Sequence, residues 1–467
     1  MKSTKSFIQT IRYTIAAVLA ILTFTSCKKF IEIDEPADQI VSSSIFRDDA
    51  SAEAAIRGIY SEMMNSSRQF TSGYTTLFAG MAADELYYYS PSNRDEFVNN
   101  QITLSNHNLL TSSFWQPAYR YIYTANLCIE GLQQSAGVSP QIRNRLIGEA
   151  KFIRAFSYFH LVNLFGDVPL VLTTDYKTNA TLPRTDTSKV FQQIIFDLEE
   201  AKALLPSTYP TPVKARPNKY AAAALLAKVY LYRRDWNNAE ATSFLIISSG
   251  QYSLETNLAN VFLQTSNESI WQLYPSNANF NTYEGNQIIP SSNSSSPTFL
   301  MRPGLLNAFE AGDLRKLNWT KSRTFSSQTL WYPYKYKVRG GNSSVPLTEC
   351  YSIFRLSDIY LIRAEARTQL NNVTGAQGDI NIVRNRAGLS NTMANTQATL
   401  LLAIEQERRI ELFAEWGNRW YDLKRTNRVN DIISVLKPAT WNLTDALWPI
   451  PIDQITRNPF LTQNAGY

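Results

Sequence analysis

The chain has 467 residues, of which 44% are hydrophobic, and its formal net charge at pH 7 is +6. This length is ample for a large hydrophobic core, and so small a net charge argues against nucleic acid as a partner. Two histidines and three cysteines supply little material for a metal site, and we predict neither a metal nor a cofactor.

Residues 1–26 have the organisation of a lipoprotein signal peptide. Three basic residues precede an apolar run at residues 15–24, which is too short to span a membrane comfortably. The run leads into Cys27 and resembles a bacterial lipobox, although Leu22 lies five residues before the cysteine instead of three. Lipidation of Cys27 with several acyl chains would anchor the chain firmly to a membrane. The alternative is an ordinary signal peptide followed by a chance cysteine.

The remaining chain is predicted to be mostly helical. Cap residues and apolar periodicity define the expected helices. Three helices are expected to begin at Asp48, at Ser139-Pro140 and at Asp186 or Thr187. Residues 218–249 are expected to form a helical hairpin, residues 355–371 and 374–387 a second hairpin, and residues 397–424 one long helix. No segment after the signal peptide approaches the roughly 18 uninterrupted apolar residues of a membrane span.

The hairpin at residues 218–249 resembles the tetratricopeptide pattern, in which small residues let two antiparallel helices approach closely and an aromatic residue fills the turn. Trp236 occupies the aromatic position, whereas Arg233 and Arg234 stand where the pattern prefers a small residue and glycine. A weaker instance lies at residues 361–376. The two hairpins predict stacked helical repeats.

Two long irregular stretches interrupt the helices, at residues 65–113 and at about residues 274–340. Residues 235–301 contain no Lys or Arg and are rich in Ser, Asn and aromatic residues, with a short strand expected around Trp271. Long irregular inserts on a rigid scaffold are a common place for binding sites. The lack of positive charge favours a neutral ligand.

Several segments resemble, in order, those of the SusD/RagB family. They lie at residues 149–159, 164–170, 355–366, 384–389, 407–412, 419–425, 447–451 and 458–467. The resemblance implies a mainly α fold, which is a tetratricopeptide-like α-superhelix with long irregular loop inserts and a few short strands. It also implies one domain at residues 27–467, whose N-terminal part (about 27–300) and C-terminal part (about 301–467) are intertwined.

The same resemblance implies a function on the cell surface. Members are lipid-anchored on the outer membrane and pair with a SusC-like TonB-dependent β-barrel transporter, to which they deliver nutrient. We therefore expect a glycan-binding subunit with an oligosaccharide ligand. The alternative is a peptide-binding or protein-docking lipoprotein of the same architecture.

We expect no enzymatic activity. The sequence has no G-x-S-x-G elbow, no phosphate-binding glycine loop and no Cys–His signature of a nucleophile. Glu411 and Asp422 offer a pair of carboxylates of the kind that glycosidases use. Arginines flank both residues, so we interpret them as ion-pair partners that fix helix packing.

A sugar presents C–H faces that stack on aromatic rings and hydroxyl groups that bind amides and charged side chains. The two irregular stretches combine these residue types, and three successive tyrosines cannot all face one core. The predicted ligand-contacting residues are Tyr87, Tyr88, Tyr89, Tyr283, Trp319 and Trp331.

Two cysteines remain after Cys27. Cys128 and Cys350 can pair in an oxidising compartment. Cys128 falls in an apolar helical stretch, which favours a buried free thiol.

Overall fold

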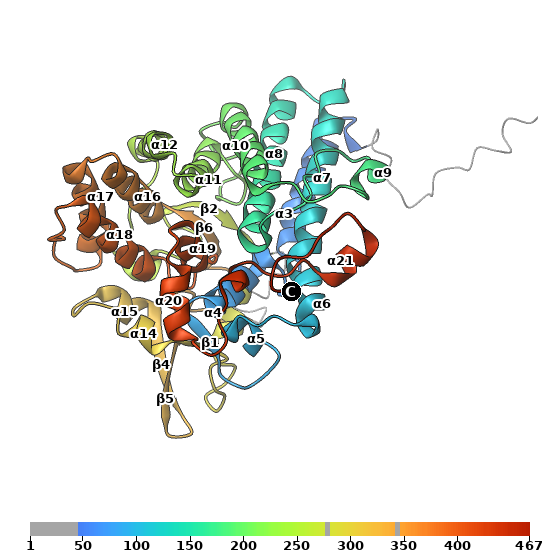
Figure 1. Cartoon of the computed structure of the whole chain (residues 1–467). Helices are drawn as coiled ribbons and strands as arrows, with labels where there is room; N and C mark the ends of the chain where they lie inside the picture. Colours follow the sequence, from blue (N-terminus) through green and yellow to red (C-terminus); the bar gives the residue numbers. More distant parts are fainter. Residues whose placement is uncertain (1–44, 276–280, 341–345) are drawn as a thin grey trace, which may run out of the picture. The chain divides into compact units, whose positions relative to one another are not determined.

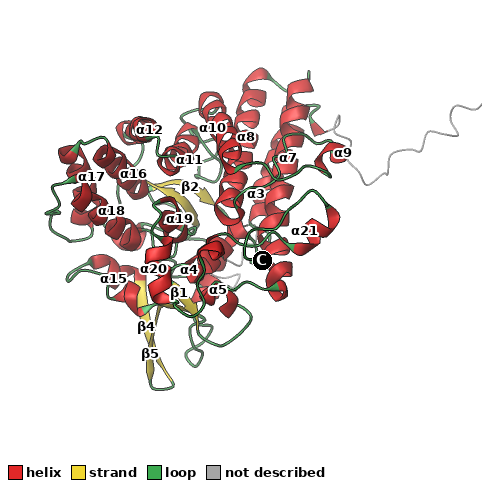
Figure 2. Ribbon diagram, viewed as in Figure 1, coloured by secondary structure: helices red, strands yellow, loops and turns green. Residues whose placement is uncertain are grey.

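The structure, a computed structural model, describes residues 45–275, 281–340 and 346–467. Residues Phe46–Tyr467 form one compact unit, which is mainly helical (Figures 1 and 2). The predicted mainly α fold is therefore confirmed. Cys27 and the predicted signal peptide lie outside the described residues.

Eleven of the described helices have eight or more residues. They are α3 (Asp49–Met63), α7 (Gln116–Gln134), α8 (Pro140–Phe165), α10 (Thr187–Leu204), α11 (Lys219–Tyr232), α12 (Trp236–Ser248), α16 (Leu356–Gln369), α17 (Val373–Arg386), α18 (Gln397–Glu411), α19 (Asn418–Arg425) and α20 (Val429–Leu436). The shorter α-helices are α4 (Gly80–Ala82), α5 (Asp95–Asn99), α6 (His107–Leu110), α9 (Tyr176–Asn179), α13 (Tyr283–Ile288), α14 (Pro303–Leu306), α15 (Leu314–Trp319) and α21 (Ile452–Arg457). The 3-10 and π turns are η2 (Phe70–Ser72), η3 (Thr75–Ala79), η4 (Leu104–Asn106), η5 (Thr111–Trp115), η6 (Leu258–Asn260) and η7 (Leu443–Ala446).

The long helices form a row in which each packs against the next along the chain, from α3 through α7, α8, α10, α11, α12, α16 and α17 to α18 (Figure 1). The predicted hairpins are α11–α12 and α16–α17, as expected. The two irregular stretches leave the row along the chain between α3 and α7 and between α12 and α16, although these helices pack against each other in space. The repeats therefore act as a scaffold, and the inserts fold beside it.

The cap residues explain where several helices begin. The Asp48 carboxylate accepts a hydrogen bond from the Ser51 amide, and Asp186 accepts one from Ser188, as predicted. Ser139 begins α8 without capping it. Its hydroxyl instead donates to Asp49 Oδ2 at 2.9 Å, which ties α8 to the start of α3.

Six short strands form three antiparallel pairs within the described residues: β1 (Leu86–Tyr88) with β3 (Phe299–Met301), β2 (Ser269–Leu273) with β6 (Tyr351–Arg355), and β4 (Thr320–Phe325) with β5 (Gln328–Pro333). The first pair joins the two irregular stretches. Leu86 pairs with Met301 and Tyr88 with Phe299. Two inserts far apart in the sequence therefore meet at one place.

The prediction of one long helix at residues 397–424 is wrong. α18 ends at Glu411, and the chain turns before α19 begins at Asn418. Ala414, Trp416 and Gly417 have positive φ angles of 48°, 51° and 70°. The Trp416 indole donates to Ser352 O at 2.9 Å and its amide to Thr76 Oγ1 at 3.0 Å. These tertiary contacts stabilise a turn where the apolar spacing of the segment alone predicts a continuous helix.

An ionic core lies at the junction of the scaffold and the second insert. The buried Arg355 guanidinium contacts the carboxylates of Glu268, Glu411 and Glu415 at 2.7–2.9 Å. Glu411 also accepts hydrogen bonds from Arg386 and Arg315, at 2.6 and 3.1 Å. Burial favours the neutral acid, but the surrounding guanidinium groups hold the pKa of Glu411 well below its ordinary value.

Asp422 is likewise an ion-pair partner, of Arg408 and Arg425 at 2.8 and 2.7 Å. The structural interpretation of Glu411 and Asp422 is therefore confirmed. Cys128 and Cys350 are both free and buried. In the part of the chain that the structure describes, no helix is both long and apolar enough to cross a membrane.

Candidate functional site

The three tyrosines of the first insert lie half-buried in and just after strand β1. Tyr88 packs edge-on against its cross-strand partner Phe299, with ring centroids 5.4 Å apart. The Arg94 guanidinium lies 5.0 Å from the centre of the Tyr88 ring and donates to its hydroxyl at 3.1 Å. Tyr88 is thus held in place beside a cation and retains some exposed surface.

Tyr87 and Tyr89 lie on the opposite side of the strand from Tyr88, because side chains alternate along a strand. The Tyr89 ring packs edge-on against Phe325 at a centroid distance of 5.9 Å, and its amide donates to Thr298 O at 3.0 Å. Partial burial raises the pKa of Tyr87. Tyr89 therefore links the first insert to the β4–β5 hairpin of the second.

Trp331 occupies the solvent-facing side of that hairpin. It pairs with Ser322 across the two strands and is half-buried, whereas its strand neighbours Leu330 and Tyr332 are buried on the other side. Exposed Ser322, Thr324 and Thr329 share its side. A half-exposed indole surrounded by hydroxyl groups has the chemistry of a platform for a sugar ring.

The serine-rich loop of the second insert is fastened to this hairpin by Arg323. Its Nη1 donates to the backbone oxygens of Ser292 and Ser295, both at 2.6 Å. Arg323 and Phe325 lie on the face of the hairpin opposite Trp331, because side chains alternate along a strand. The loop and Tyr89 therefore contact one face of the hairpin, and Trp331 belongs to the other. Sequence reasoning did not anticipate Arg323 or Phe325, which organise the first of these faces without being conspicuous in the sequence.

Two of the six predicted contact residues, Trp319 and Tyr283, are buried in the structure. Trp319 has no exposed surface, donates from its indole to Leu258 O at 3.0 Å, and lies 4.7 Å from the Lys335 ammonium group. Tyr283 is 5% exposed, at the start of α13. Trp319 follows the buried Arg315 by four residues in α15, and residues at this spacing lie on the same face of a helix. Both side chains therefore face the core.

Models of protein families match two long segments of the chain. Residues 29–231 match a model described as "Starch-binding associating with outer membrane", and residues 314–467 match the model of the SusD family. The chain belongs to the SusD family. Its relatives include SusD-like protein P25 of Formosa agariphila, which is 27% identical over 98% of this chain and 99% of its own length.

Solved structures of the SusD family share this fold. A SusD homolog from Bacteroides thetaiotaomicron is 17% identical, with a TM-score of 0.79 over 91% of this chain and 98% of that one. A laminarin-binding SusD-like protein is 24% identical, with a TM-score of 0.73 over 90% of this chain and 100% of that one. At these identities the likeness concerns the fold.

The described residues contain no group of three or more His, Cys, Asp or Glu side chains placed to hold a metal ion. His160 is buried against Tyr421, whose hydroxyl lies 3.1 Å from its Nδ1. Burial lowers the pKa of His160 to about 3, so this ring is neutral at ordinary pH. It has the surroundings of a packed residue.

Glu85, which directly precedes β1, is expected to make the folding stability of this SusD-family protein depend on pH. Burial, aided by the neighbouring Asp84 charge, raises the pKa of Glu85 from 4.5 to about 8. A raised pKa means that the folded state holds the proton more tightly, so the stability that this group confers is present in acid. It declines above pH 4.5 and is lost as the pH passes about 8.

We therefore expect Glu85→Gln to have little effect on stability at pH 5 and to stabilise the protein at pH 9 by about 1–3 kcal/mol. Urea unfolding at both pH values measures this difference. Glu310→Gln is the control. Hydrogen bonds from Arg384 lower the pKa of the exposed Glu310, so its removal should not stabilise the protein at pH 9. Equal effects of Glu85→Gln at the two pH values would contradict the assignment.

Proposed function

We propose that this SusD-family protein is a cell-surface glycan-binding subunit that captures nutrient for a SusC-like TonB-dependent transporter. The observation that carries the proposal is the match of residues 29–231 to a family model described as starch-binding and associating with the outer membrane. Half-buried aromatic rings and hydroxyl groups on β1, the β4–β5 hairpin and the serine-rich loop support it. The ligand is a neutral oligosaccharide, and the protein binds it without cleaving it.

On the two inserts we assign ligand contact to Tyr87, Tyr88, Tyr89 and Trp331. All four are half-buried, so each ring is fixed and still offers surface. A ring already held in place loses little side-chain entropy when a sugar stacks on it, so one or two such rings can dominate the affinity.

Titration with oligosaccharides of stated composition tests the proposal. Laminarin-derived oligosaccharides are the first choice, because a relative of the same fold binds laminarin. We expect saturable binding of at least one neutral glycan and no shorter product after prolonged incubation. Binding of a peptide library without any binding across a broad glycan array would overturn the proposal.

We propose further that residues 27–467 act as one domain, lipid-anchored through Cys27 and facing the cell exterior. Support for a single domain comes from contacts between distant segments. Asp84 forms ion pairs with Arg409 and Arg419, each at 2.8 Å. The intertwining makes separate folding of the two parts unfavourable.

Replacement of Cys27 tests the anchor. Cys27→Ala should abolish incorporation of a fatty-acid probe and release the protein from the outer-membrane fraction, since no acyl chain then holds it. Cys128→Ala is the matched control, because this thiol is buried in α7 and should leave labelling and fractionation unchanged. Persistent labelling and membrane association of Cys27→Ala would show that the lipobox is misassigned.

A further inference from the structure

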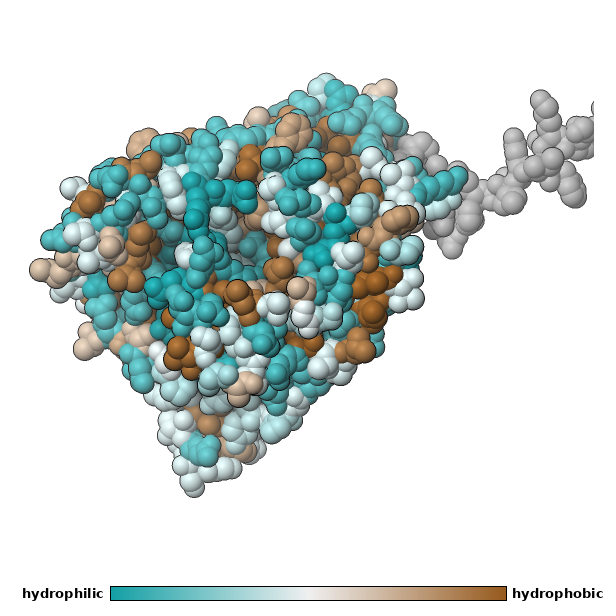
Figure 3. Space-filling view, viewed as in Figure 1, coloured by the Kyte–Doolittle hydropathy of each residue, from teal (hydrophilic) through white to brown (hydrophobic). Residues whose placement is uncertain are grey.

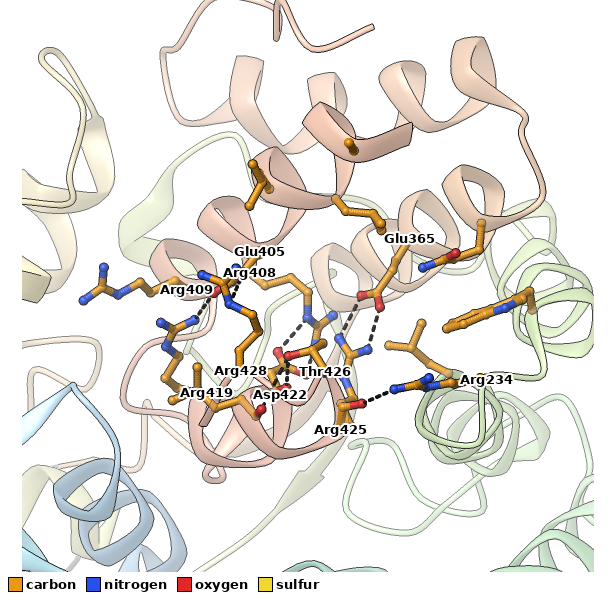
Figure 4. A pocket seen from close by; sticks show the side chains of 17 residues that line it. Arg234, Glu365, Glu405, Arg408, Arg409, Arg419, Asp422, Arg425, Thr426 and Arg428 are labelled. Carbon is orange, nitrogen blue, oxygen red and sulfur yellow. Dashed lines mark hydrogen bonds and ion pairs between the residues drawn. The ribbon is translucent and has the colours of Figure 1, made fainter. Parts of the chain in front are cut away.

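A cavity of about 650 Å³ opens on the helical scaffold, and none of Tyr87, Tyr88, Tyr89 and Trp331 lines it. Residues from α11, α12, α16, α18 and α19 line it, together with the turns that join them (Figure 4). Hydrophilic residues predominate over this part of the molecule in Figure 3. The volume suits a ligand of roughly the size of one or two sugar units.

Positive charge exceeds negative charge in the lining. Six arginines and three carboxylates contribute to it. Arg408 and Arg425 share Asp422 at 2.8 and 2.7 Å, and Arg425 also binds both oxygens of Glu365, at 2.6 and 2.7 Å. These pairs account for two of the carboxylates, Asp422 and Glu365.

The third carboxylate, Glu405, is shared unequally. It accepts a hydrogen bond from Arg419 at 3.1 Å, and Arg428 Nε lies 3.8 Å from Glu405 and 3.9 Å from Asp431. Arg428 Nε is buried and has no hydrogen-bond partner among the described residues. Arg234 forms no ion pair in the described part of the chain, and its Nη2 donates a hydrogen bond to Arg425 O at 3.3 Å. Carboxylates outside the lining also pair with Arg408, Arg409 and Arg428, namely Asp358, Asp84 and Asp431. Among the described residues, Arg234 is therefore the arginine of the lining without an ion pair, and Figure 4 shows it at the cavity.

Arg234 is also an unusual residue for its backbone position. It has a φ angle of 59°, in the turn between α11 and α12. The turns after α16 and α19 have the same form, with Asn371 at 60° and Asn427 at 59°. In each turn the next amide donates to the carbonyl five residues earlier, at 2.7–2.9 Å. Asparagine tolerates this conformation far better than arginine does.

An arginine thus occupies a position that two equivalent turns fill with asparagine and that the tetratricopeptide pattern fills with glycine. Such a backbone conformation persists where the surrounding structure or a function over-determines it. Trp236, the first residue of α12, lines the same cavity two residues further on and is half-buried. One turn therefore presents an unmatched guanidinium group beside an aromatic ring.

We propose that this cavity binds a small carboxylate-bearing molecule, whose carboxylate meets Arg234 and whose apolar face packs on Trp236. Guanidinium groups bind carboxylates by charge-assisted hydrogen bonds, which are stronger than neutral ones. This site does not include the four aromatic rings of the inserts and does not depend on the proposed glycan binding. The carboxylate can belong to an acidic sugar or to another organic acid.

Ligand titrations with matched neutral analogues test the site. The detergent-solubilised full-length protein is titrated with glucuronate and glucuronamide, and with phenylacetate and phenylacetamide, by calorimetry and ligand-observed NMR. We expect at least one acid to bind about tenfold or more tightly than its amide. Preference for glucuronate assigns an acidic sugar, and preference for phenylacetate assigns another organic acid.

Arg234→Asn should reduce the affinity of the acid to that of its amide and should not lower the unfolding temperature, since asparagine occupies the equivalent turns. Arg233→Gln removes the same charge from a neighbouring residue outside the lining and should change the affinity by less than about twofold. Trp236→Leu removes the aromatic contact and provides a second, independent loss of affinity should Arg234→Asn disturb folding.

Equal binding of acids and amides, absence of binding by both acids, or equal effects of Arg234→Asn and Arg233→Gln would overturn the proposal. Laminarin-oligosaccharide binding is measured on the same samples. A protein that binds the neutral glycan and neither acid would refute only the carboxylate site. A protein that binds an acid and no glycan would refute only the proposed function.

Discussion

Glu411→Gln should destabilise the protein by about 3–5 kcal/mol, as expected when one partner of a buried ion pair is removed. The Glu411 carboxylate has no exposed surface and accepts hydrogen bonds from three guanidinium groups, those of Arg315, Arg355 and Arg386. A glutamine of the same shape keeps the volume but leaves these cations without a full negative charge. Urea unfolding of wild type and variant measures the loss.

Glu310→Gln is the matched control for this substitution. Glu310 pairs with Arg384 at 2.6 Å, but its side chain is 46% exposed, and water screens such a pair. Its removal should cost less than about 1 kcal/mol. Similar losses for the two variants would contradict the view that burial gives Glu411 its large effect. A hydrolytic activity lost in Glu411→Gln at unchanged stability would instead revive the catalytic interpretation.

The scaffold of this protein is well predicted by its sequence, because its signals are local. Cap residues such as Asp48 and Asp186 act on amides two or three residues away, and the pairing of α11 with α12 follows from small residues on adjacent helices. The end of α18 could not be predicted in this way. The apolar spacing continues past Glu411, and the turn depends on bonds from Trp416 to Ser352 and Thr76, which lie 64 and 340 residues away.

The ligand site is less predictable for a related reason. Composition identifies segments rich in aromatic and hydroxyl groups, and the structure brings the two segments together through β1 and β3. Composition does not say which ring faces outward. Trp319 and Trp331 belong to the same segment, and only their partners distinguish them: three cations surround the first, from Lys335, Arg355 and Arg386, whereas hydroxyl groups flank the second. Composition gives no sign of the cavity at Arg234, because scaffold helices and their turns line it, and the irregular segments do not.

Alanine substitutions of these two tryptophans should therefore have opposite signatures. Trp331→Ala should weaken binding of a neutral glycan by about 1–3 kcal/mol, on the scale of base–aromatic stacking, and should lower stability by less than about 1 kcal/mol. Trp319→Ala should lower the stability by about 3–5 kcal/mol, because it empties a fully enclosed site. Calorimetric titration with a glycan ligand and urea unfolding, performed on both variants, measure the two quantities.

The same two measurements on Tyr87→Ala, Tyr88→Ala and Tyr89→Ala extend the comparison to the first insert. Tyr89 packs on Phe325, and Tyr88 packs on Phe299 and Arg94, so each should lose some stability as well as affinity. Trp331 extends from the solvent-facing side of its hairpin, so its substitution should reduce glycan affinity with the smallest loss of folding stability. If Trp331→Ala and all three tyrosine variants retain full affinity for a glycan that the wild type binds, the ligand lies elsewhere. The scaffold cavity would then be the next surface to test, because it combines an aromatic ring with unmatched hydrogen-bond donors.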